Sequence, residues 1–398
     1  MIRLVQPTPR GAGLANPTED GSRPLSPSPS SPRRRVLVVG IDGVRLDLLR
    51  AVPTPHLDAV ADAGFLGRIE IDEATPTMSG PCWTTIATGV GVAKHGVYGN
   101  HFGGNRLDVF PDFATRLAQE DGRKTFVAGG WEPLFLARQG GPLFAAPGRL
   151  SYIAPRADTS EDWDACDDQV TDDAVRVLAT DDPEVSFVYL GAVDETGHLL
   201  GCGSAYLRAI ERADERLGRL LTAVRSRPVY ARESWTVIAV TDHGHRDEGG
   251  HGGRTPQERS AWVACCGPDI PARPPSRPLR FEDVAVQVYA SLGRAADSHR
   301  TPDGSALSTP ASAPLTPAPA GSPVMSLTVQ SPGLACSWSA PLRVAAPGTV
   351  GLDPSSVTSG APPTCSPGAR STLRLLPDGS LVRELENSAS APLTYRRR

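Results

Sequence analysis

The sequence predicts an α/β fold in which a mostly parallel central sheet is flanked by helices. From Val36 onward, short apolar runs alternate with amphipathic stretches, which is typical of this class. Residues 204–226 carry apolar side chains at i, i+3 and i+4 spacing, so this stretch is predicted to be a long amphipathic helix. Of the 398 residues, 39% are hydrophobic, which is enough for the core of one large or two ordinary domains.

The elements of this fold follow one another through the middle of the chain. The first is the run VLVVG, whose unbroken apolar character indicates a strand buried on both faces. Similar short runs predict strands at residues 36–40, 68–71, 125–128, 185–190, 235–240 and 261–265. The stretches between them predict helices at residues 81–88, 111–119, 167–179, 204–226 and 281–292.

The two ends of the chain differ in composition from this middle part. Residues 1–34 are rich in Pro, Ser and Arg and bury too little apolar surface to offset their ordering entropy, so we expect a disordered N-terminal tail. Residues 309–398 begin with a Pro/Ser/Ala-rich linker and are expected to form a low-complexity tail that could contain a small β unit. The folded domain is therefore expected at residues 35–308. Short strands within the tail are predicted at residues 324–329, 373–376 and 381–385.

Charge and cysteine content exclude several classes of protein. A net charge of -4 gives no basic footprint for duplex nucleic acid, and no apolar stretch is long enough to span a membrane. The seven cysteines are odd in number and form no CxxC pair, which favours a reducing compartment. We expect a cytoplasmic protein; a twin-arginine export signal at residues 33–35 is the alternative, although the apolar run after it is short.

Acidic residues follow three of the predicted strands. Asp42 comes directly after VLVVGI, Asp194 after VSFVYLGAV and Asp242 after VIAVT. Ligands of an open parallel sheet gather outside the carboxyl ends of its strands, so these side chains are expected to lie together. Each Asp alone is explained as well by a turn or a helix cap. The repetition at three strands favours a shared site.

Histidines accompany two of these acids. His198 lies four residues after Asp194, and the stretch TDHGHRDEGGHGG contains three of the eight histidines of the chain, His243, His245 and His251. Carboxylates and imidazoles are good ligands for zinc, and glycines let side chains crowd around one centre. This number of oxygen and nitrogen ligands is what a two-metal phosphoryl-transfer centre requires.

Ser79 is a candidate nucleophile. It precedes Pro81 at the start of a predicted helix, where backbone N–H groups and the helix dipole favour an anion. An ordinary Ser N-cap explains the same pattern equally well. Cys82, on the same turn, is more simply a small packed residue, since no basic partner is evident in the sequence.

Together these residues resemble the alkaline phosphatase superfamily, and within it the type I phosphodiesterase/nucleotide pyrophosphatase family. The motifs GIDG, TMSGPCWTTIATG, KHGVYGN, DETGHLLG and TDHGH occur in this order between Val36 and Leu307. The resemblance implies an alkaline-phosphatase-like domain with a metal at each of two sites. It implies that one metal is held by Asp42, Ser79, Asp242 and His243, and the other by Asp194, His198 and His251.

The same resemblance assigns the residues that act on the substrate. Ser79 matches the nucleophile that forms a covalent phosphoserine, and Asn100 matches an asparagine that contacts a phosphoryl oxygen. The backbone N–H near Gly80 is expected to support Asn100 in holding charge on the phosphoryl group. Trp83 is a candidate for stacking on a nucleobase, although core packing is the simpler explanation.

Three features depart from the family patterns. The nucleotide pyrophosphatases usually have Thr in place of Ser79, a change that keeps the hydroxyl. Their last histidine ligand lies far downstream, so His251 is chosen here with His245 or His299 as alternatives. Sulfatases of the superfamily carry an Arg where Trp83 stands, which argues against sulfatase activity.

The sequence therefore predicts a two-metal hydrolase of phosphate diesters or pyrophosphates of nucleotide type. Two zinc ions are the expected cofactors, with manganese or iron as alternatives. A phosphomonoesterase or phosphonate hydrolase on the same metals, or an inactive binding relative, are the competing functions. The expected partner is a small phosphate ester or nucleotide, and the sequence makes no prediction of oligomeric state.

Overall fold

The computed structural model describes residues 32–294, 302–308, 323–331, 334–346, 349–359, 369–375, 381–386 and 393–395. The chain forms two compact units, one within Ser26–Ala311 and one that includes Ser312–Arg398. Of the tail predicted over residues 1–34, residues 1–31 lie outside the described residues, as does the alternative ligand His299. Arg33 and Arg34 were wrongly included in that tail, since they pair with a neighbouring strand at the start of the first strand. In the part that is described, we find no helix that combines the length and the apolar character needed to span a membrane.

The larger unit is built around a seven-stranded sheet with the strand order β2-β7-β6-β1-β5-β3-β4. β7 is antiparallel to both of its neighbours, and the other pairs are parallel. This confirms the predicted α/β fold with a mostly parallel sheet. The strands are β1 (Arg33–Ile41), β2 (Gly64–Glu70), β3 (Thr125–Gly129), β4 (Arg149–Tyr152), β5 (Val185–Leu190), β6 (Glu233–Val240) and β7 (Ser260–Cys266).

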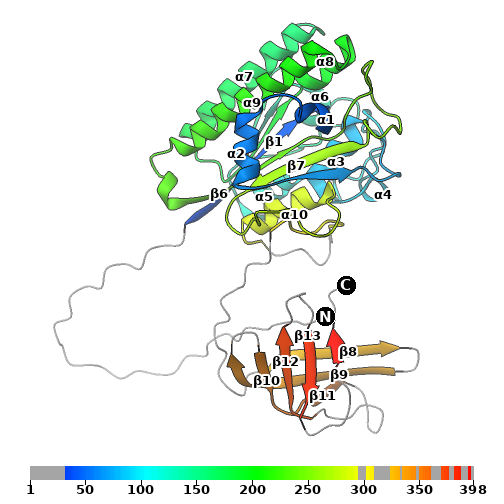
Figure 1. Cartoon of the computed structure of the whole chain (residues 1–398), viewed down its shortest axis with the longest axis vertical. Helices are drawn as coiled ribbons and strands as arrows, with labels where there is room; N and C mark the ends of the chain where they lie inside the picture. Colours follow the sequence, from blue (N-terminus) through cyan, green and yellow to red (C-terminus); the bar gives the residue numbers. More distant parts are fainter. Residues whose placement is uncertain are drawn as a thin grey trace, which may run out of the picture. The chain divides into compact units, whose positions relative to one another are not determined.

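Helices cover both faces of this sheet (Figure 1). Alternate residues of β1 point to opposite faces, with Val36 and Val38 in one buried cluster and Leu37 and Val39 in the other. One layer consists of α1 (Leu46–Leu49), α2 (Pro55–Asp62), α7 (Ser160–Thr180), α8 (Ala192–Leu200) and α9 (Ser204–Arg225). The other consists of α3 (Ser79–Thr88), α4 (Val92–His95), α5 (Phe113–Asp121), α6 (Glu132–Phe135) and α10 (Glu282–Ser291).

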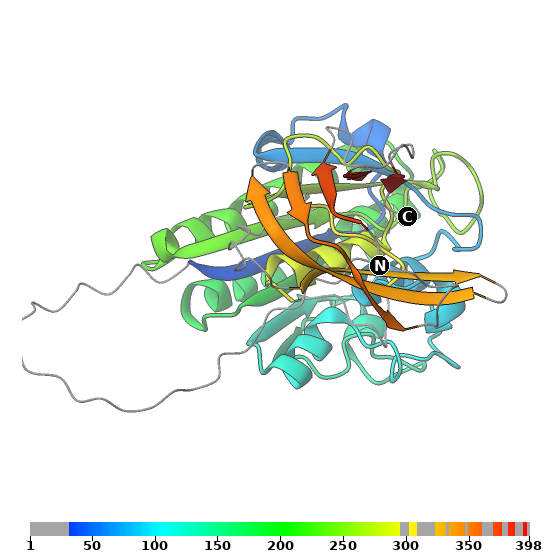
Figure 2. The same ribbon diagram turned by 90° about the horizontal axis from the view of Figure 1, so that it is seen from below.

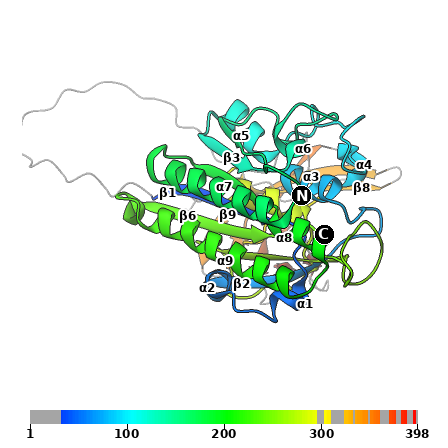
Figure 3. The same cartoon turned by 90° about the horizontal axis from the view of Figure 1, so that it is seen from above.

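The two layers can be followed from opposite sides of the larger unit. In Figure 3, α7 and α9 run side by side along the sheet, and their facing sides carry Arg216 of α9 paired with Asp164 and Asp168 of α7. In Figure 2, α5 and α10 of the opposite layer can be found by their cyan and yellow colours. The three strands β6, β1 and β5 lie in the centre of the sheet between these layers, so their carboxyl ends open at one edge.

Several predicted elements differ in extent from those observed. The helix predicted at residues 81–88 begins at Ser79, and the one predicted at 167–179 begins at Ser160, where Thr159 accepts a hydrogen bond from the Asp162 N–H. β2 begins at Gly64, because pairing with β7 extends the strand through glycines that resemble a turn in the sequence. The sequence analysis missed β4, α1, α2, α4, α6 and α8, which are short elements held mainly by tertiary packing.

The second unit contains a seven-stranded sheet with the order β11-β9-β10-β12-β13-β14, in which β8 also pairs with β9. All of its pairs are antiparallel. The strands predicted at residues 324–329 and 381–385 fall within β8 and β13, and the one predicted at 373–376 overlaps β12 up to Leu375, with residue 376 outside the described residues. The domain boundary after residue 308 stays a prediction. The strands are β8 (Pro323–Ser331), β9 (Leu334–Ala346), β10 (Thr349–Leu352), β11 (Ser356–Ser359), β12 (Ser371–Leu375), β13 (Leu381–Leu385) and β14 (Leu393–Tyr395).

Candidate metal centre

The three candidate aspartates lie at the same edge of the central sheet. Asp42 directly follows β1, and Asp242 lies two residues beyond the end of β6. Asp194 follows β5 on the first turn of α8, where the sequence analysis considered a loop. Because residues four apart lie on one face of a helix, α8 presents Asp194 and His198 together.

Ser79, Asp42, Asp242 and His243 form a first group, which we call the strand-end cluster. His243 Nε2 lies 3.4 Å from Ser79 Oγ, 3.5 Å from Asp42 Oδ1 and 3.2 Å from Asp242 Oδ2. Two ligand atoms bound to one tetrahedral zinc ion lie about 3.3 Å apart, since each is about 2.0–2.1 Å from the metal. The spacing in the strand-end cluster therefore matches that of ligands to a common cation.

Hydrogen bonds hold one oxygen of each carboxylate and leave the other without a partner. Trp83 Nε1 and the Tyr189 hydroxyl donate to Asp42 Oδ2 at 2.8 and 2.7 Å. The N–H groups of Gly43 and His243 donate to Asp242 Oδ1 at 3.1 and 3.0 Å. The remaining oxygens, Asp42 Oδ1 and Asp242 Oδ2, are buried and have no hydrogen-bond partner within the described part of the chain. A buried carboxylate oxygen left in this state is a ready ligand for a cation.

The position of Trp83 agrees with core packing, the simpler explanation, and rules out the candidate role in stacking on a nucleobase. The residue is 1% exposed, and its ring packs edge-on against Phe187 and Tyr189 in the core. Its indole N–H is used to hold Asp42. Trp83 therefore orients a candidate metal ligand from the protein side and has no surface to offer a nucleobase.

Asn100 and Gly80 lie next to each other beside Ser79. The Gly80 N–H at the start of α3 donates to Asn100 Oδ1 at 2.9 Å. This bond places the Asn100 amide at the helix N-terminus, and its contact with a phosphoryl oxygen stays a prediction. A Cβ at Gly80 would lie 2.3 Å from the Gly99 carbonyl oxygen, so only glycine allows this close approach.

Asp194, His198 and His251 form a second group, the helix–loop cluster. Asp194 Oδ2 lies 3.4 Å from His198 Nε2, and Asp194 Oδ1 lies 3.5 Å from His251 Nε2. The distance between Asp194 Oδ2 and His198 matches the ligand spacing of about 3.3 Å, and His251 lies beside the other oxygen of the same carboxylate. The two imidazole Nε2 atoms are 2.8 Å apart, so they would have to separate slightly to bind one ion. The structure thus brings together the residues predicted for the second metal.

Thr77 anchors the glycine-rich loop that carries His251. Its carbonyl accepts a hydrogen bond from His251 Nδ1 at 2.7 Å, its hydroxyl accepts from the Gly252 N–H at 3.0 Å, and the same hydroxyl donates to the Gly253 carbonyl. A histidine that donates Nδ1–H to a carbonyl keeps its Nε2 lone pair for a metal. The sequence analysis missed Thr77, although it lies only two residues before Ser79.

Asp167 anchors the helix that carries Asp194. From α7, its two carboxylate oxygens accept hydrogen bonds from the N–H groups of Gly191 and Ala192 at 3.0 and 2.9 Å. These donors begin α8 and have no partner within the helix. No local motif marks Asp167, because it caps a helix that begins 25 residues later in the chain.

Burial and like charge make the cluster unfavourable without a cation. Burial, together with the charge of Asp194, raises the pKa of Asp42 to about 7. Burial and the charge of Asp42 also raise the pKa of Asp242. Burial lowers the pKa of His243, which keeps its imidazole in the neutral form that binds metals. A divalent cation would remove the repulsion between the carboxylates.

In the helix–loop cluster the imidazoles act in the opposite direction. Burial raises the pKa of Asp194, but its interactions with the neighbouring imidazoles, first of all that of His251, outweigh this and hold the pKa well below its usual value. The hydrogen bond to Asp194 raises the pKa of His198 to about 9. This cluster is therefore richer in nitrogen ligands and closer to neutral than the strand-end cluster.

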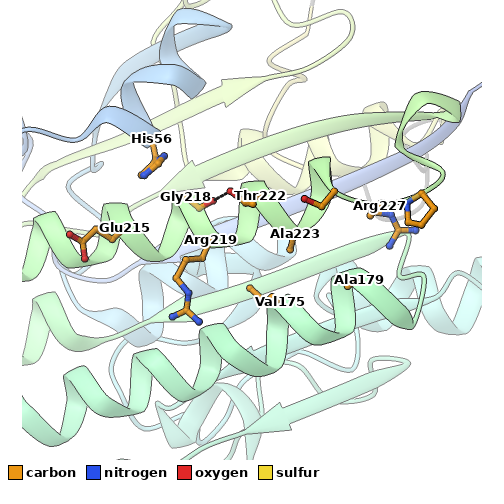
Figure 4. Close-up of a pocket in the computed structure, with 11 residues that line it drawn as sticks. His56, Val175, Ala179, Glu215, Gly218, Arg219, Thr222, Ala223 and Arg227 are labelled. Atoms are coloured by element: carbon orange, nitrogen blue, oxygen red, sulfur yellow. Dashed lines mark hydrogen bonds between the residues drawn. The ribbon is translucent and has the colours of Figure 1, made fainter.

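A cavity of about 600 Å³ lies elsewhere, between α2, α7 and α9 (Figure 4). His56 of α2 and Val175 of α7 line it together with Arg219 of α9. None of the candidate site residues lines this cavity. The candidate metal centre is thus set apart from it, at the carboxyl edge of the sheet.

The fold and the arrangement of Asp, His and Ser residues at that edge define the alkaline phosphatase superfamily. A 2-O GAG sulfatase has a similar structure, with a TM-score of 0.54 and 13% sequence identity over 81% of this chain and 82% of its own. Another similar protein, whose structure was solved in complex with its substrate D-glucosamine-2-N,6-O-disulfate, gives a TM-score of 0.52 and 12% sequence identity over 88% of this chain and 91% of that protein's chain. At these identities the likeness concerns the fold.

Within this superfamily, the chain belongs to the type I phosphodiesterase / nucleotide pyrophosphatase family, whose model matches residues 36–252. Ectonucleotide pyrophosphatase/phosphodiesterase family member 7 of Rattus norvegicus is 26% identical over 53% of this chain and 50% of its own length. Family member 5 of Homo sapiens is 25% identical over 53% of this chain and 45% of its own length. The chain thus spans about half the length of the curated relatives it matches.

Proposed function

We propose that the chain hydrolyses phosphate diesters or pyrophosphates of nucleotide type with two metal ions. The observation that carries this proposal is the pair of unpartnered buried oxygens, Asp42 Oδ1 and Asp242 Oδ2, beside the hydroxyl of Ser79. When bound, the metals would activate the nucleophile and stabilise the leaving oxygen. Zinc fits the mixed Asp and His donors best, and manganese or iron are the alternatives.

Ser79 is the nucleophile in this proposal. Its Oγ attacks phosphorus, forming an Oγ–P bond as the bond from phosphorus to the leaving oxygen breaks. Water then cleaves the phosphoserine, so that the two steps together add one water across the P–O bond. Ser79 lies on the first turn of α3 and is 5% exposed, so its hydroxyl is held in one place at the helix N-terminus.

Asn100 and the N-terminus of α3 hold the phosphoryl group. In the free protein the Gly80 N–H donates to the side-chain oxygen Oδ1 of Asn100. When substrate binds, the same N–H donates to a phosphoryl oxygen instead. In the transition state, negative charge is spread over the equatorial oxygens, and fixed donors stabilise it there. These residues therefore orient the substrate for attack by Ser79.

Two basic side chains close in sequence to Asp42 and Ser79, those of Arg45 and Lys94, are already paired, which favours a diester over a monoester as the substrate. Arg45 pairs with Asp47 and Asp247, and Lys94 pairs with Asp303 at 2.6 Å. A monoester carries one more negative charge than a diester and calls for an additional cation at the phosphoryl group. These two cations are instead used in pairs with protein carboxylates.

A phosphomonoesterase or phosphonate hydrolase is the second candidate, and Arg246 favours it. A Cβ at Gly250 would lie 2.9 Å from Arg246 Nη2, so this exposed guanidinium lies against the loop that ends at His251. From there it could meet the extra charge of a monoester. An inactive binding relative is the third candidate, and it predicts little bound metal. The expected cytoplasmic location stays a prediction.

Hydrolysis of bis-p-nitrophenyl phosphate beside p-nitrophenyl phosphate tests the proposal. The full chain is assayed with zinc and with chelator, and Ser79→Ala provides the blank. We expect a chelator-sensitive preference for the diester that is lost in Ser79→Ala. A preference for the monoester would assign the second function, and no turnover with less than about one metal per chain would assign the third.

A further inference from the structure

His245 lies beside the helix–loop cluster, but its contacts differ from those of the other histidines. Its side chain is fully buried, and its Nε2 lies 2.6 Å from Asp194 Oδ1. Its Nδ1 is buried and has no hydrogen-bond partner among the residues that the structure describes. The sequence favoured His251 as the last ligand of the second metal site and left His245 and His299 as alternatives, of which His299 lies outside the described residues.

Distances separate these two residues. The Nε2 of His251 lies 3.5 Å from Asp194 Oδ1, too far for a strong hydrogen bond, and it is Nδ1 of this ring that donates, to the Thr77 carbonyl. The Nε2 of His245 lies 2.6 Å from the same oxygen, which is the length of a strong hydrogen bond to a carboxylate. His245 therefore contacts Asp194 as a donor contacts an acceptor.

The contacts of Nδ1, the other ring nitrogen, also distinguish the candidate metal ligands from His245. His243 and His251 place Nδ1 on the carbonyl oxygens of Gly244 and Thr77, so each carries its proton on Nδ1 and keeps Nε2 free. In His245 the proton belongs on Nε2, because Asp194 is the acceptor there and a buried N–H at Nδ1 would have none. With this tautomer, His245 has no Nε2 lone pair for a metal.

Two glycines create the space in which His245 meets Asp194. A Cβ at Gly43, which has a φ of 67°, would lie 2.5 Å from Asp194 Oδ1 and 2.8 Å from His245 Nε2. A Cβ at Gly197 would lie 2.9 Å from the His245 ring. Both chain segments can approach the pair only because they lack a side chain.

We propose that His245 is a positioning residue that donates Nε2–H to Asp194 Oδ1 and turns Oδ2 toward the metal. Asp194 then resembles Asp42 and Asp242, in each of which the protein holds one oxygen and leaves the other for a cation. His198 and His251 are left as the imidazole ligands of the second site. This inference rests on the proposed two-metal function and assigns the ligand that the sequence left open.

Metal titration of the full chain against a competing chelator tests this role. His245→Ala should still bind two zinc ions at saturation, with one of them held about 10- to 100-fold more weakly. His245→Gln keeps an N–H donor near the position of Nε2 and should restore the affinity to within a few-fold of the original. His251→Ala should lose one ion altogether. His95→Gln, a buried histidine bonded to Thr85 and Val97, is the matched control and should change neither ion.

The outcomes separate this inference from the proposed function. Loss of a whole ion in His245→Ala, an unchanged affinity, or an equal loss in His245→Gln would each overturn the positioning role. If the unaltered chain binds no divalent metal, the proposed function falls as well. Should His245→Ala fail to fold, Gly197→Ala provides the test, because its new Cβ would displace the His245 ring and should weaken the same ion.

Discussion

The strand-end cluster and the helix–loop cluster are built in different ways. Asp42 and Asp242 follow neighbouring parallel strands, so the hydrogen bonds between β1 and β6 set their separation. Asp194 and His251 lie on a helix and on a glycine-rich loop, and side chains such as Asp167 and Thr77 set their positions. The comparison teaches that a sheet edge by itself sets the separation of two ligand-bearing residues, and donors such as Trp83 and Tyr189 then orient the Asp42 carboxylate. A helix and a loop need hydrogen bonds from residues far away in the sequence even to set that separation.

The largest expected effect is the loss of one metal ion, and with it of turnover, when a ligand of either cluster is removed. Asp42→Asn should remove the ion of the strand-end cluster, and His251→Ala should remove that of the helix–loop cluster. Each variant should lose at least about 1,000-fold in diester turnover, because both ions act on one transferred group. Metal content per chain, measured beside turnover, checks this. If either variant loses both ions, the clusters are a single cooperative site and the comparison fails.

The next effect concerns the stability of the metal-free protein as a function of pH. The pKa of Asp42 is about 7 in the folded chain and 3.8 as a free side chain, so between these values the folded state binds more protons than the unfolded state. Stability contributed by the protonated form is present below about pH 4 and is lost as the pH rises to about 7, at up to about 1.4 kcal/mol per pH unit. The pKa of Asp194 is lowered, so its effect falls below this range.

Denaturant unfolding in chelator between pH 4.5 and 7 measures this slope. Asp167, with a pKa of about 7, contributes a slope of the same sign, so Asp42→Asn should reduce the slope without abolishing it. Saturating zinc should reduce it too, since the bound cation favours the ionised carboxylates. If the slope is unchanged in Asp42→Asn, the raised pKa of Asp42 does not contribute to the pH dependence of the unfolding free energy.

A smaller effect tests the anchor of the glycine-rich loop. Thr77→Val keeps the carbonyl that accepts from His251 but removes the hydroxyl that bonds Gly252 and Gly253. We expect a loss of about 2 kcal/mol in stability and a roughly 10-fold weaker ion at the helix–loop cluster alone. Thr77→Ser keeps the hydroxyl and serves as the control. Weakening of the strand-end ion instead would contradict the separate support of the two clusters.

The smallest effect concerns the donors that hold Asp42. Tyr189→Phe removes one of the two hydrogen bonds to Oδ2 and leaves the other, from Trp83, in place. We expect about 1 kcal/mol of lost stability and a few-fold weaker strand-end ion, measured by unfolding and chelator competition. Tyr152→Phe, on the edge strand β4, is a tyrosine control away from the cluster. No change in Tyr189→Phe would show that the Trp83 indole holds Asp42 alone.

The features that could be predicted from the sequence are those encoded locally. The run VLVVGID predicts a buried strand that ends in an acid, and the same pattern before Asp194 and Asp242 predicts that the three meet at one edge. Ser79 was recognised because Pro81 marks the start of a helix. Periodicity and strand-end position are properties of short segments, so they survive without knowledge of the tertiary structure.

The roles of Trp83, His245, Thr77 and Asp167 were decided only by the tertiary structure. Trp83 turns its indole to Asp42, 41 residues away, and His245 reaches Asp194, 51 residues away. Contacts of this range depend on the order of strands in the sheet and on which glycines let two segments approach. A single sequence shows which side chains can donate, accept or bind a metal. Packing decides which of them face each other, because a hydrogen bond or a metal ligand requires positions defined to within a few tenths of an ångström.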